Sequence, residues 1–357
     1  MCILVCFDAS GPKQKKVGNV YMKKRFVFIL IFMFMFVVSF TLNVYASSTK
    51  RLAGETRYDT SASIARDGWK QSNYAILAYG ENYPDALGVV PLAKKYDAPI
   101  VLTNGTNLPT VSKETLIDLQ VKNVFIIGGT AVIPSSIDAE LQSMEIIVTR
   151  IAGQDRYDTA IKVAQQLPSP TEIFVTTGED FPDALSLAPI AALKQVPIIL
   201  VPKDYLPDSV KAYLSANEII KTFVVGNSDI IEDSIINQFP GSERIIGVNR
   251  YARNINVNEK FDHLFSSPDI SIATGEGFAD AITGAAYAAK QGMPIVLVND
   301  DPLAYTRIFT VHKLNTDNPN NGDAYVFGGQ IVVPDNVVAY LYTLPATDQP
   351  NRPMGTY

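Results

Sequence analysis

The chain has 357 residues, with 30 Lys and Arg against 36 Asp and Glu and a formal net charge of −6. The first 46 residues contain six of the basic residues and one acid, so the rest of the chain has a net charge of −11. This acidity argues against general electrostatic binding of nucleic acid or of an anionic membrane, and an anionic partner would need local basic groups. Both cysteines precede residue 47, so the rest of the chain has no disulfide, cysteine zinc site or thiol nucleophile.

The first 46 residues are typical of a secretory leader. A basic run at 22–25 precedes an apolar stretch at 26–42, and the small residues Val44 and Ala46 suit a signal-peptidase site. We therefore expect cleavage after Ala46. Met22 is the expected start of translation, because a basic segment should open a signal. A retained membrane anchor is the alternative, since this 17-residue stretch, apolar except for Ser39 and Thr41, approaches the length of a spanning helix.

Beyond residue 46 the sequence is a threefold repeat. The stretch 80–87, Gly-Glu-Asn-Tyr-Pro-Asp-Ala-Leu, returns at 178–185 and in altered form at 275–282, at spacings of 98 and 97 residues. Below, this is the repeated stretch. An opening motif, Arg-x-x-Gly-x-x-Arg-Tyr, precedes it in each copy and starts at Arg51, Arg150 and Arg244. Such even spacing indicates three copies of one folding unit.

Each copy is predicted to contain the same elements in the same order. A helical pattern follows the opening motif. Short apolar runs bounded by glycine then predict buried strands at 74–79, 173–177 and 270–274. The repeated stretch begins the next helix, where Pro84 and Pro182 suit the first turn and Asp85 and Asp183 suit the positive end of the helix dipole.

A second strand in each copy carries the motif Pro-Ile-x-Leu. Its residues are Pro99, Ile100, Val101 and Leu102, then Pro197, Ile198, Ile199 and Leu200, and finally Pro294, Ile295, Val296 and Leu297. A leading proline is tolerated at the first residue of a strand. Third strands are predicted at 124–129, 223–226 and 325–329. A short fourth run at 146–148 leads to the next opening motif.

Strands that alternate with helices predict an α/β fold with parallel sheets covered on both faces. We divide the chain into a leader (1–46), three modules (47–149, 150–243 and 244–345) and a tail (346–357). Each module is large enough for its own core. The repeated stretch falls at the carboxyl edge of its sheet, where ligands usually bind in this architecture.

The opening motif, the repeated stretch, Pro-Ile-x-Leu and Ile-Ile-Gly-Gly together resemble the type 2 cell-wall-binding repeat (CWB2) of Gram-positive bacteria, especially clostridia. The resemblance covers nearly all of residues 51–345. It implies three tandem modules with a Rossmann- or toprim-like fold, packed as a triangle about a pseudo-threefold axis. It also implies non-covalent attachment to an anionic, teichoic-acid-like wall polymer, with surface-layer proteins as further partners. The family's Pro-Ile-Leu-Leu motif is implicated in attachment, which makes the three Pro-Ile-x-Leu strands candidate binding segments.

The copies are not identical. In the third copy Ala279 replaces proline, Ile282 replaces leucine, and Ala252 and Arg253 replace Asp-Thr. In the second copy Asn227 replaces the second glycine of the Gly-Gly pair. We therefore expect the site of the third copy to differ from the other two.

Six repeated arginines are candidate polymer-binding residues: Arg51, Arg57, Arg150, Arg156, Arg244 and Arg250. A guanidinium group binds phosphate or carboxylate well. The favoured alternative is ion pairing between modules, with acids such as Asp59 and Asp158, because the opening motif adjoins a module boundary.

Three repeated acid pairs are candidate ligands for a divalent cation such as Ca²⁺ or Mg²⁺: Glu81 and Asp85, Glu179 and Asp183, and Glu276 and Asp280. Such a cation could bridge the protein to a polymer phosphate. The favoured alternative is compensation of the helix dipole and hydrogen bonding in the turn. We expect no other cofactor. The double glycines at 128–129 and 328–329 indicate tight turns, because no complete nucleotide-binding motif accompanies them.

The alternative function is a peptidoglycan hydrolase, an N-acetylmuramoyl-L-alanine amidase, or a modifier of one, since such enzymes travel with these modules. Zinc amidases need histidine and acidic ligands. Beyond residue 46 the sequence has two histidines, His263 and His312, both in the third copy. It has no Gly-x-Ser-x-Gly elbow. We therefore expect a secreted, non-enzymatic protein of the cell wall that binds neither nucleic acid nor, after cleavage, the membrane.

Overall fold

The computed structural model describes residues 48–314 and 321–344. The predicted leader with its cleavage site, and the predicted tail, lie outside the described residues. Residues 48–314 and 321–344 belong to one compact unit. Across the described ranges, no helix has the length and hydropathy that a membrane span requires.

The elements follow the repeat. Up to the second opening motif they are β1 (Thr49–Leu52), α2 (Arg57–Gly68), β2 (Tyr74–Tyr79), α3 (Val90–Lys95), β3 (Ile100–Thr103), α4 (Thr110–Asp118), β4 (Asn123–Ile127), α5 (Ser135–Ser143) and β5 (Ile147–Ile151). The second copy contains α6 (Arg156–Ala164), β6 (Glu172–Thr177), α7 (Pro182–Lys194), β7 (Ile198–Val201), α8 (Asp208–Ala216), β8 (Lys221–Val225), α9 (Asp233–Ile236) and β9 (Ser242–Ile245). The third contains α10 (Arg250–Lys260), the 3₁₀ helix η1 (Asp262–Leu264), β10 (Ile270–Thr274), α11 (Ala279–Gln291), β11 (Ile295–Val298), α12 (Ala304–Leu314), β12 (Ala324–Phe327) and α13 (Asp335–Leu341).

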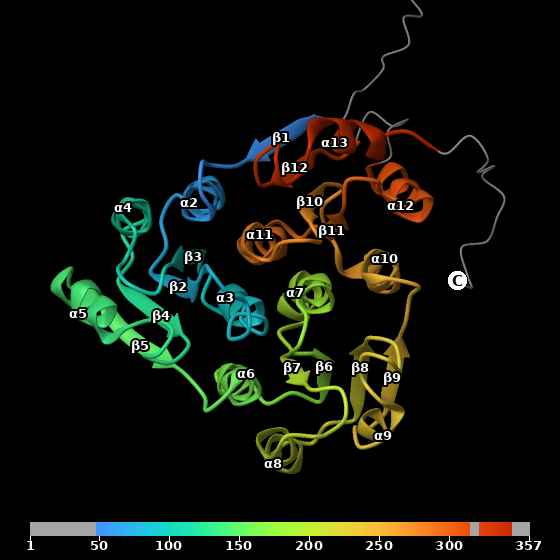
Figure 1. The fold of residues 1–357 in the computed structure, drawn as a ribbon, viewed down its shortest axis with the longest axis horizontal. Coiled ribbons are helices and arrows are strands. Elements are labelled where there is room, and N and C mark those ends of the chain that lie inside the picture. The colour runs from blue at the N-terminus through green and yellow to red at the C-terminus, as the bar shows by residue number, and fades with distance from the viewer. Residues whose placement is uncertain (1–47, 315–320, 345–357) are drawn as a thin grey trace, which may run out of the picture. The chain divides into compact units, whose positions relative to one another are not determined.

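The described strands form three parallel sheets of four strands each, in the orders β3-β2-β4-β5, β7-β6-β8-β9 and β11-β10-β12-β1 (Figure 1). The two inner strands of each sheet are almost entirely buried, as expected when helices cover both faces of a parallel sheet. The predicted α/β fold with three modules is confirmed.

The first strand belongs to the last sheet. β1 pairs with β12, with Thr49 opposite Ala324 and Leu52 opposite Phe327. Figure 1 shows this blue strand beside the red elements of the third module. In every copy, therefore, the strand that carries the first arginine of the opening motif completes the preceding sheet, and the three modules are connected in a closed cycle. The sheets thus do not follow the repeat boundaries expected at residues 47, 150 and 244.

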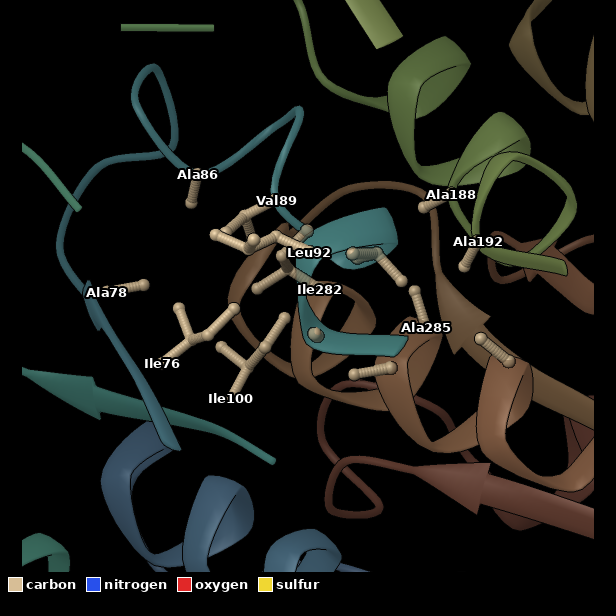
Figure 2. Close-up of a cluster of buried hydrophobic side chains, with 14 of the residues drawn as sticks. Ile76, Ala78, Ala86, Val89, Leu92, Ile100, Ala188, Ala192, Ile282 and Ala285 are labelled. Carbon is tan, nitrogen blue, oxygen red and sulfur yellow. The ribbon is translucent and has the colours of Figure 1, made fainter. Parts of the chain in front are cut away.

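Equivalent helices of the three modules meet at one centre. Each of α3, α7 and α11 packs against the other two. Figure 2 shows Leu92, Ala188, Ala192, Ile282 and Ala285 from these helices in one buried cluster. The three alanines are fully buried, and small side chains allow the helices to approach closely. This packing agrees with the predicted pseudo-threefold arrangement.

One predicted helix start is wrong. α7 begins at Pro182, but in the first copy α3 begins at Val90 instead of Pro84. At the position of Gly88 the second copy has Ser186, whose hydroxyl donates to the Pro182 carbonyl. Glycine has no such bond and has a high entropic cost in a helix. The segment before Val90 therefore forms turns instead.

Candidate functional site

The first arginine of each opening motif stabilises the sheet that its own strand completes. Arg51, Arg150 and Arg244 donate from Nη1 to the carbonyls of Gly328 (2.7 Å), Gly128 (2.7 Å) and Gly226 (2.5 Å), respectively. Each also pairs through Nη2 with an aspartate in the first turn or two of the helix that follows this glycine. These aspartates are Asp335, Asp138 and Asp233, respectively. These arginines therefore clamp the third strand's glycine turn to the fourth strand.

The second arginine of each motif binds the repeated stretch. Arg57, Arg156 and Arg250 donate to the carbonyls of Gly80 (2.6 Å), Gly178 (2.5 Å) and Gly275 (3.1 Å), respectively. Arg250 also crosses to Asp180 of the second copy at 3.1 Å. The anticipated partners have other roles, since Asp59 caps α2 through Thr56 and Asp158 pairs with Lys162. Polymer binding by the arginines stays a prediction.

The glycine between these arginines is required by packing. A Cβ atom placed on Gly54 would lie 2.3 Å from the Cβ of Asp59, and one on Gly153 would lie 2.3 Å from the Thr159 nitrogen. The chain therefore passes directly over the first turn of the next helix, which brings both arginines of the motif to one edge.

The glutamates of the repeated stretch contact tyrosines that the sequence analysis did not single out. The Tyr58 hydroxyl donates to Glu81 and the Tyr251 hydroxyl to Glu276. Burial, together with the neighbouring glutamate, raises the pKa of both tyrosines, and burial raises the pKa of the equivalent Tyr157 to about 12. These tyrosines are neutral donors at physiological pH. The sequence could have identified these tyrosines, because a tyrosine follows the second arginine of the opening motif in every copy.

The aromatic position of the repeated stretch joins the modules. The ring centroid of Tyr83 lies 5.3 Å from that of Phe181 and 5.9 Å from that of Phe278, and the two phenylalanines are 6.4 Å apart. The Tyr83 hydroxyl donates to the Glu179 carbonyl at 2.8 Å. One aromatic ring from each module thus meets the other two, which explains why this position is aromatic in all three copies.

The aspartates of the repeated stretch occupy three different environments. Asp85 is half-buried. Asp183 is 2% exposed, and both of its oxygens accept from Arg253 Nε, at 2.8 and 3.0 Å. Asp280 is 9% exposed, and its Oδ1 atom has no hydrogen-bond partner. All three copies thus differ at this position, and a functional difference of the third copy's site stays a prediction.

The acid pairs gain no third ligand for a cation. In the part of the chain that the structure describes, no group of three or more His, Cys, Asp or Glu could hold a metal ion. Glu81 and Glu276 instead accept from tyrosines and lie near arginines. A divalent-cation site at these pairs stays a prediction that the geometry does not support.

The Pro-Ile-x-Leu segments are buried along their whole length. The strands begin one residue after the proline, whose carbonyl accepts a hydrogen bond from the neighbouring strand, as Pro99 does from the Ile76 N–H. These side chains cannot touch a polymer in this conformation. Their contribution would be to position the loops that follow them, and their role in binding stays a prediction.

Two pockets lie where consecutive modules meet. The larger, with a volume of about 630 Å³, is lined by the repeated stretch of the third copy, residues 329–332 and the opening motif of the first copy. The smaller, about 370 Å³, is formed by the equivalent parts of the first and second copies. We call these the Asp280 pocket and the Asp85 pocket. The structure thus brings the repeated stretch, the glycine turn and the next opening motif together.

Asp280 should make stability fall as the pH rises. Burial raises its pKa from 3.8 to about 6, so the folded state binds more protons than the unfolded state between these values. Stability from this group is therefore full below pH 3.8 and is lost as the pH rises to about 6. Relative to Asp280→Asn, the wild type should lose about 2–3 kcal/mol across this window. Urea unfolding of both proteins from pH 4 to pH 8 measures this difference, and a constant difference would contradict the assignment.

Three parallel-sheet modules in a closed cycle, with a polar edge repeated at their junctions, define a modular α/β protein. The family model for "Cell wall binding domain 2 (CWB2)" matches residues 51–138, 150–236 and 244–338. The chain therefore belongs to this family, and the resemblance noted from its motifs is confirmed.

Curated relatives include two proteins of Bacillus subtilis (strain 168). The N-acetylmuramoyl-L-alanine amidase LytC is 30% identical over 282 residues, which are 79% of this chain and 56% of LytC. An amidase enhancer is 33% identical over 256 residues, 71% of this chain and 35% of the enhancer. The chain therefore spans about half or less of each relative's length.

Two solved structures share the fold. Cwp6 from Clostridium difficile superposes with a TM-score of 0.75 at 27% identity, over 84% of this chain and 49% of Cwp6. Cwp8 from the same organism superposes with a TM-score of 0.72 at 22% identity, over 87% of this chain and 54% of Cwp8. These matches confirm three modules of the predicted fold class.

Proposed function

We propose that this protein attaches non-covalently to the Gram-positive cell wall by binding an anionic, teichoic-acid-like polymer, and that its modules perform no catalysis. The observation that carries the proposal is the match of all three modules to the wall-binding family. The protein would be secreted and held at the cell surface, where surface-layer proteins are further candidate partners.

Local basic groups support binding of an anion despite the acidic net charge. Arg57 lines the Asp280 pocket and Arg156 lines the Asp85 pocket. The Arg57 side chain is 40% exposed and lies 3.4 Å from Glu81. A partly exposed guanidinium at a pocket wall is suited to a phosphate oxygen. The polymer would therefore approach the junctions between modules.

The second candidate is an amidase or an amidase modifier, because relatives with these names match most of this chain. His263 and His312 are both exposed, and they lie on different elements, η1 and α12. A zinc amidase would need histidine and acidic ligands brought together around an open position. The candidate is tested by peptidoglycan release.

Cosedimentation of residues 47–357 with purified walls tests the proposed function. We expect binding to native walls and its loss on walls stripped of the anionic polymer, because the polymer is the proposed ligand. An EDTA arm reports on the predicted cation site, and sensitivity to EDTA would support Ca²⁺ or Mg²⁺ as a bridge.

Equal binding to stripped walls would contradict the proposal and point to peptidoglycan itself. Release of amide-cleaved peptidoglycan by the same protein with stoichiometric zinc would favour the amidase. An Arg57→Ala and Arg156→Ala double variant is expected to bind native walls more weakly, because each change removes a pocket guanidinium. Its far-ultraviolet circular dichroism controls for folding.

A further inference from the structure

The three module junctions are built from equivalent parts, and one of the differences between them concerns a buried charge. The fourth residue of the helix that follows the opening motif is Thr60 in α2, Thr159 in α6 and Arg253 in α10. In α10 this residue adjoins the aspartate of the preceding module's repeated stretch, and in α2 it lines the same pocket as that aspartate. Arg253 and Asp183 form a pair with side-chain exposures of 8% and 3%. At the junction between the second and third modules, a guanidinium thus comes from the chain itself.

At the junction between the third and first modules, the position equivalent to Arg253 holds Thr60, and a pocket lies beside it. Thr60 and Asp280 both line the Asp280 pocket, and the Thr60 hydroxyl accepts from the Gly54 N–H at 3.1 Å. Asp280 Oδ1 is buried without a hydrogen-bond partner. Arg57 also lines this pocket, but it donates to the Gly80 carbonyl and pairs with Glu81. Asp280, which is nine-tenths buried and has one unpaired carboxylate oxygen just beneath the surface, therefore lines a cavity of about 630 Å³.

Elementary electrostatics favours a cation in that cavity. A buried carboxylate without a partner is costly, and a positively charged hydrogen-bond donor would offset the cost. Arg253 shows that this scaffold accommodates such a donor, because its Nε atom lies 2.8 and 3.0 Å from the two oxygens of Asp183. Asp280, the equivalent aspartate at the junction between the third and first modules, has the carboxylate and the space, and its neighbouring cation, Arg57, is hydrogen-bonded to the Gly80 carbonyl instead of to Asp280.

We propose that the Asp280 pocket binds a cationic group of a ligand, an ammonium or a guanidinium, in the place that Arg253 occupies at the equivalent junction. The inference deepens the proposed function and rests on it for the source of the group, a wall polymer that carries amino substituents. Its ammonium would pair with Asp280 while its phosphate faces Arg57. The pocket thus selects a polymer with both charges, and the Arg253 junction does not take the cation.

Nuclear magnetic resonance of ¹⁵N-labelled protein (residues 47–357) tests the pocket directly. The probe is methylguanidinium chloride at constant ionic strength, and the amides of Thr60 and Asp280 are followed. We expect saturable shifts in the wild type and at least about tenfold weaker binding in Asp280→Asn, because the neutral amide forms no ion pair. Asp280→Asn removes a buried charge, so it is expected to fold.

A second variant fills the pocket from within. Thr60→Arg should reproduce the arrangement at Arg253, raise the unfolding temperature and abolish the response of the Asp280 amide to methylguanidinium. The matched variant Thr159→Arg makes the same change at the equivalent position of α6 and should leave that response intact. No saturable shift in the wild type, or an undiminished affinity in Asp280→Asn, would overturn the proposal.

Walls test the source of the cation separately. Native walls should bind the wild type more strongly than Thr60→Arg, and acetylation of wall amino groups should remove this difference. If acetylation changes nothing while methylguanidinium still binds, the proposal that the pocket binds a cation stands. The proposal that the wall polymer supplies this cation is then wrong. If no walls bind at all, the proposed function fails, while the methylguanidinium titration still decides whether the pocket takes a cation.

Discussion

Removing the first strand is expected to unfold the last sheet. A chain that starts at Gly54 lacks β1, and so loses the pairing of Thr49–Leu52 with β12 and the Arg51 contacts to Gly328 and Asp335. It also loses Leu52, which is 5% exposed. Burial of one leucine contributes about 2–3 kcal/mol, and the hydrogen bonds of Arg51 add to it. The total loss should be on the order of 5 kcal/mol.

Amide hydrogen exchange measures which strands lose stability in the shortened chain. The Ala324 and Gly328 amides donate to β1 and its flanking residue, with the Ser48 and Leu52 carbonyls as acceptors. Their protection should collapse in the chain that starts at Gly54 and persist in a control chain that starts at Ser48. Greater loss of protection in β2 and β3 than in β12 would contradict the closed connection of the modules.

Asp183→Ala is expected to destabilise the protein by about 3–5 kcal/mol, because it leaves the Arg253 guanidinium buried without its counterion. The double variant Asp183→Ala with Arg253→Thr should recover most of this loss. Threonine is the residue that the other two junctions have at this position, and it removes the unpaired charge.

Urea unfolding of the wild type, the single variant and the double variant gives the three free energies. Lys211 and Asp208 form an exposed ion pair at 2.9 Å, so Asp208→Ala serves as the matched control and should cost less than about 1 kcal/mol. Equal stability of Asp183→Ala and its double variant would show that the buried charge is not the cause.

Most of the fold could be predicted because its signals are local. Apolar runs that end in glycine, such as 74–79, mark the inner strands of each sheet, and three copies of the same order leave little ambiguity. The failure at Pro84 is also local in origin, since Gly88 weakens a helix whose equivalents have Ser186 and Thr283 at this position. The sequence contained this glycine, but the similarity of the copies outweighed it in the prediction.

Parts of the site depended on tertiary structure. Repetition identified the arginines of the opening motif, but not their partners, because Arg51 pairs with Asp335 from the far end of the chain. Likewise, the departure at Arg253 was visible in the sequence, whereas its burial against Asp183 was not. The sequence shows which residues recur in the three copies, but only the three-dimensional structure shows which of them are buried.

The pairing of the first strand with the last sheet has a consequence for synthesis. The Ser48 N–H donates to the carboxylate of Asp323, 275 residues away in the sequence, and the adjacent strand β1 pairs with β12. Because the chain is made from its N-terminus, β1 exists long before β12, and contacts of such sequence separation form slowly. Until β12 has been synthesised, β1 therefore has no strand to pair with. Completion of this ladder joins the first described strand of the chain to the last.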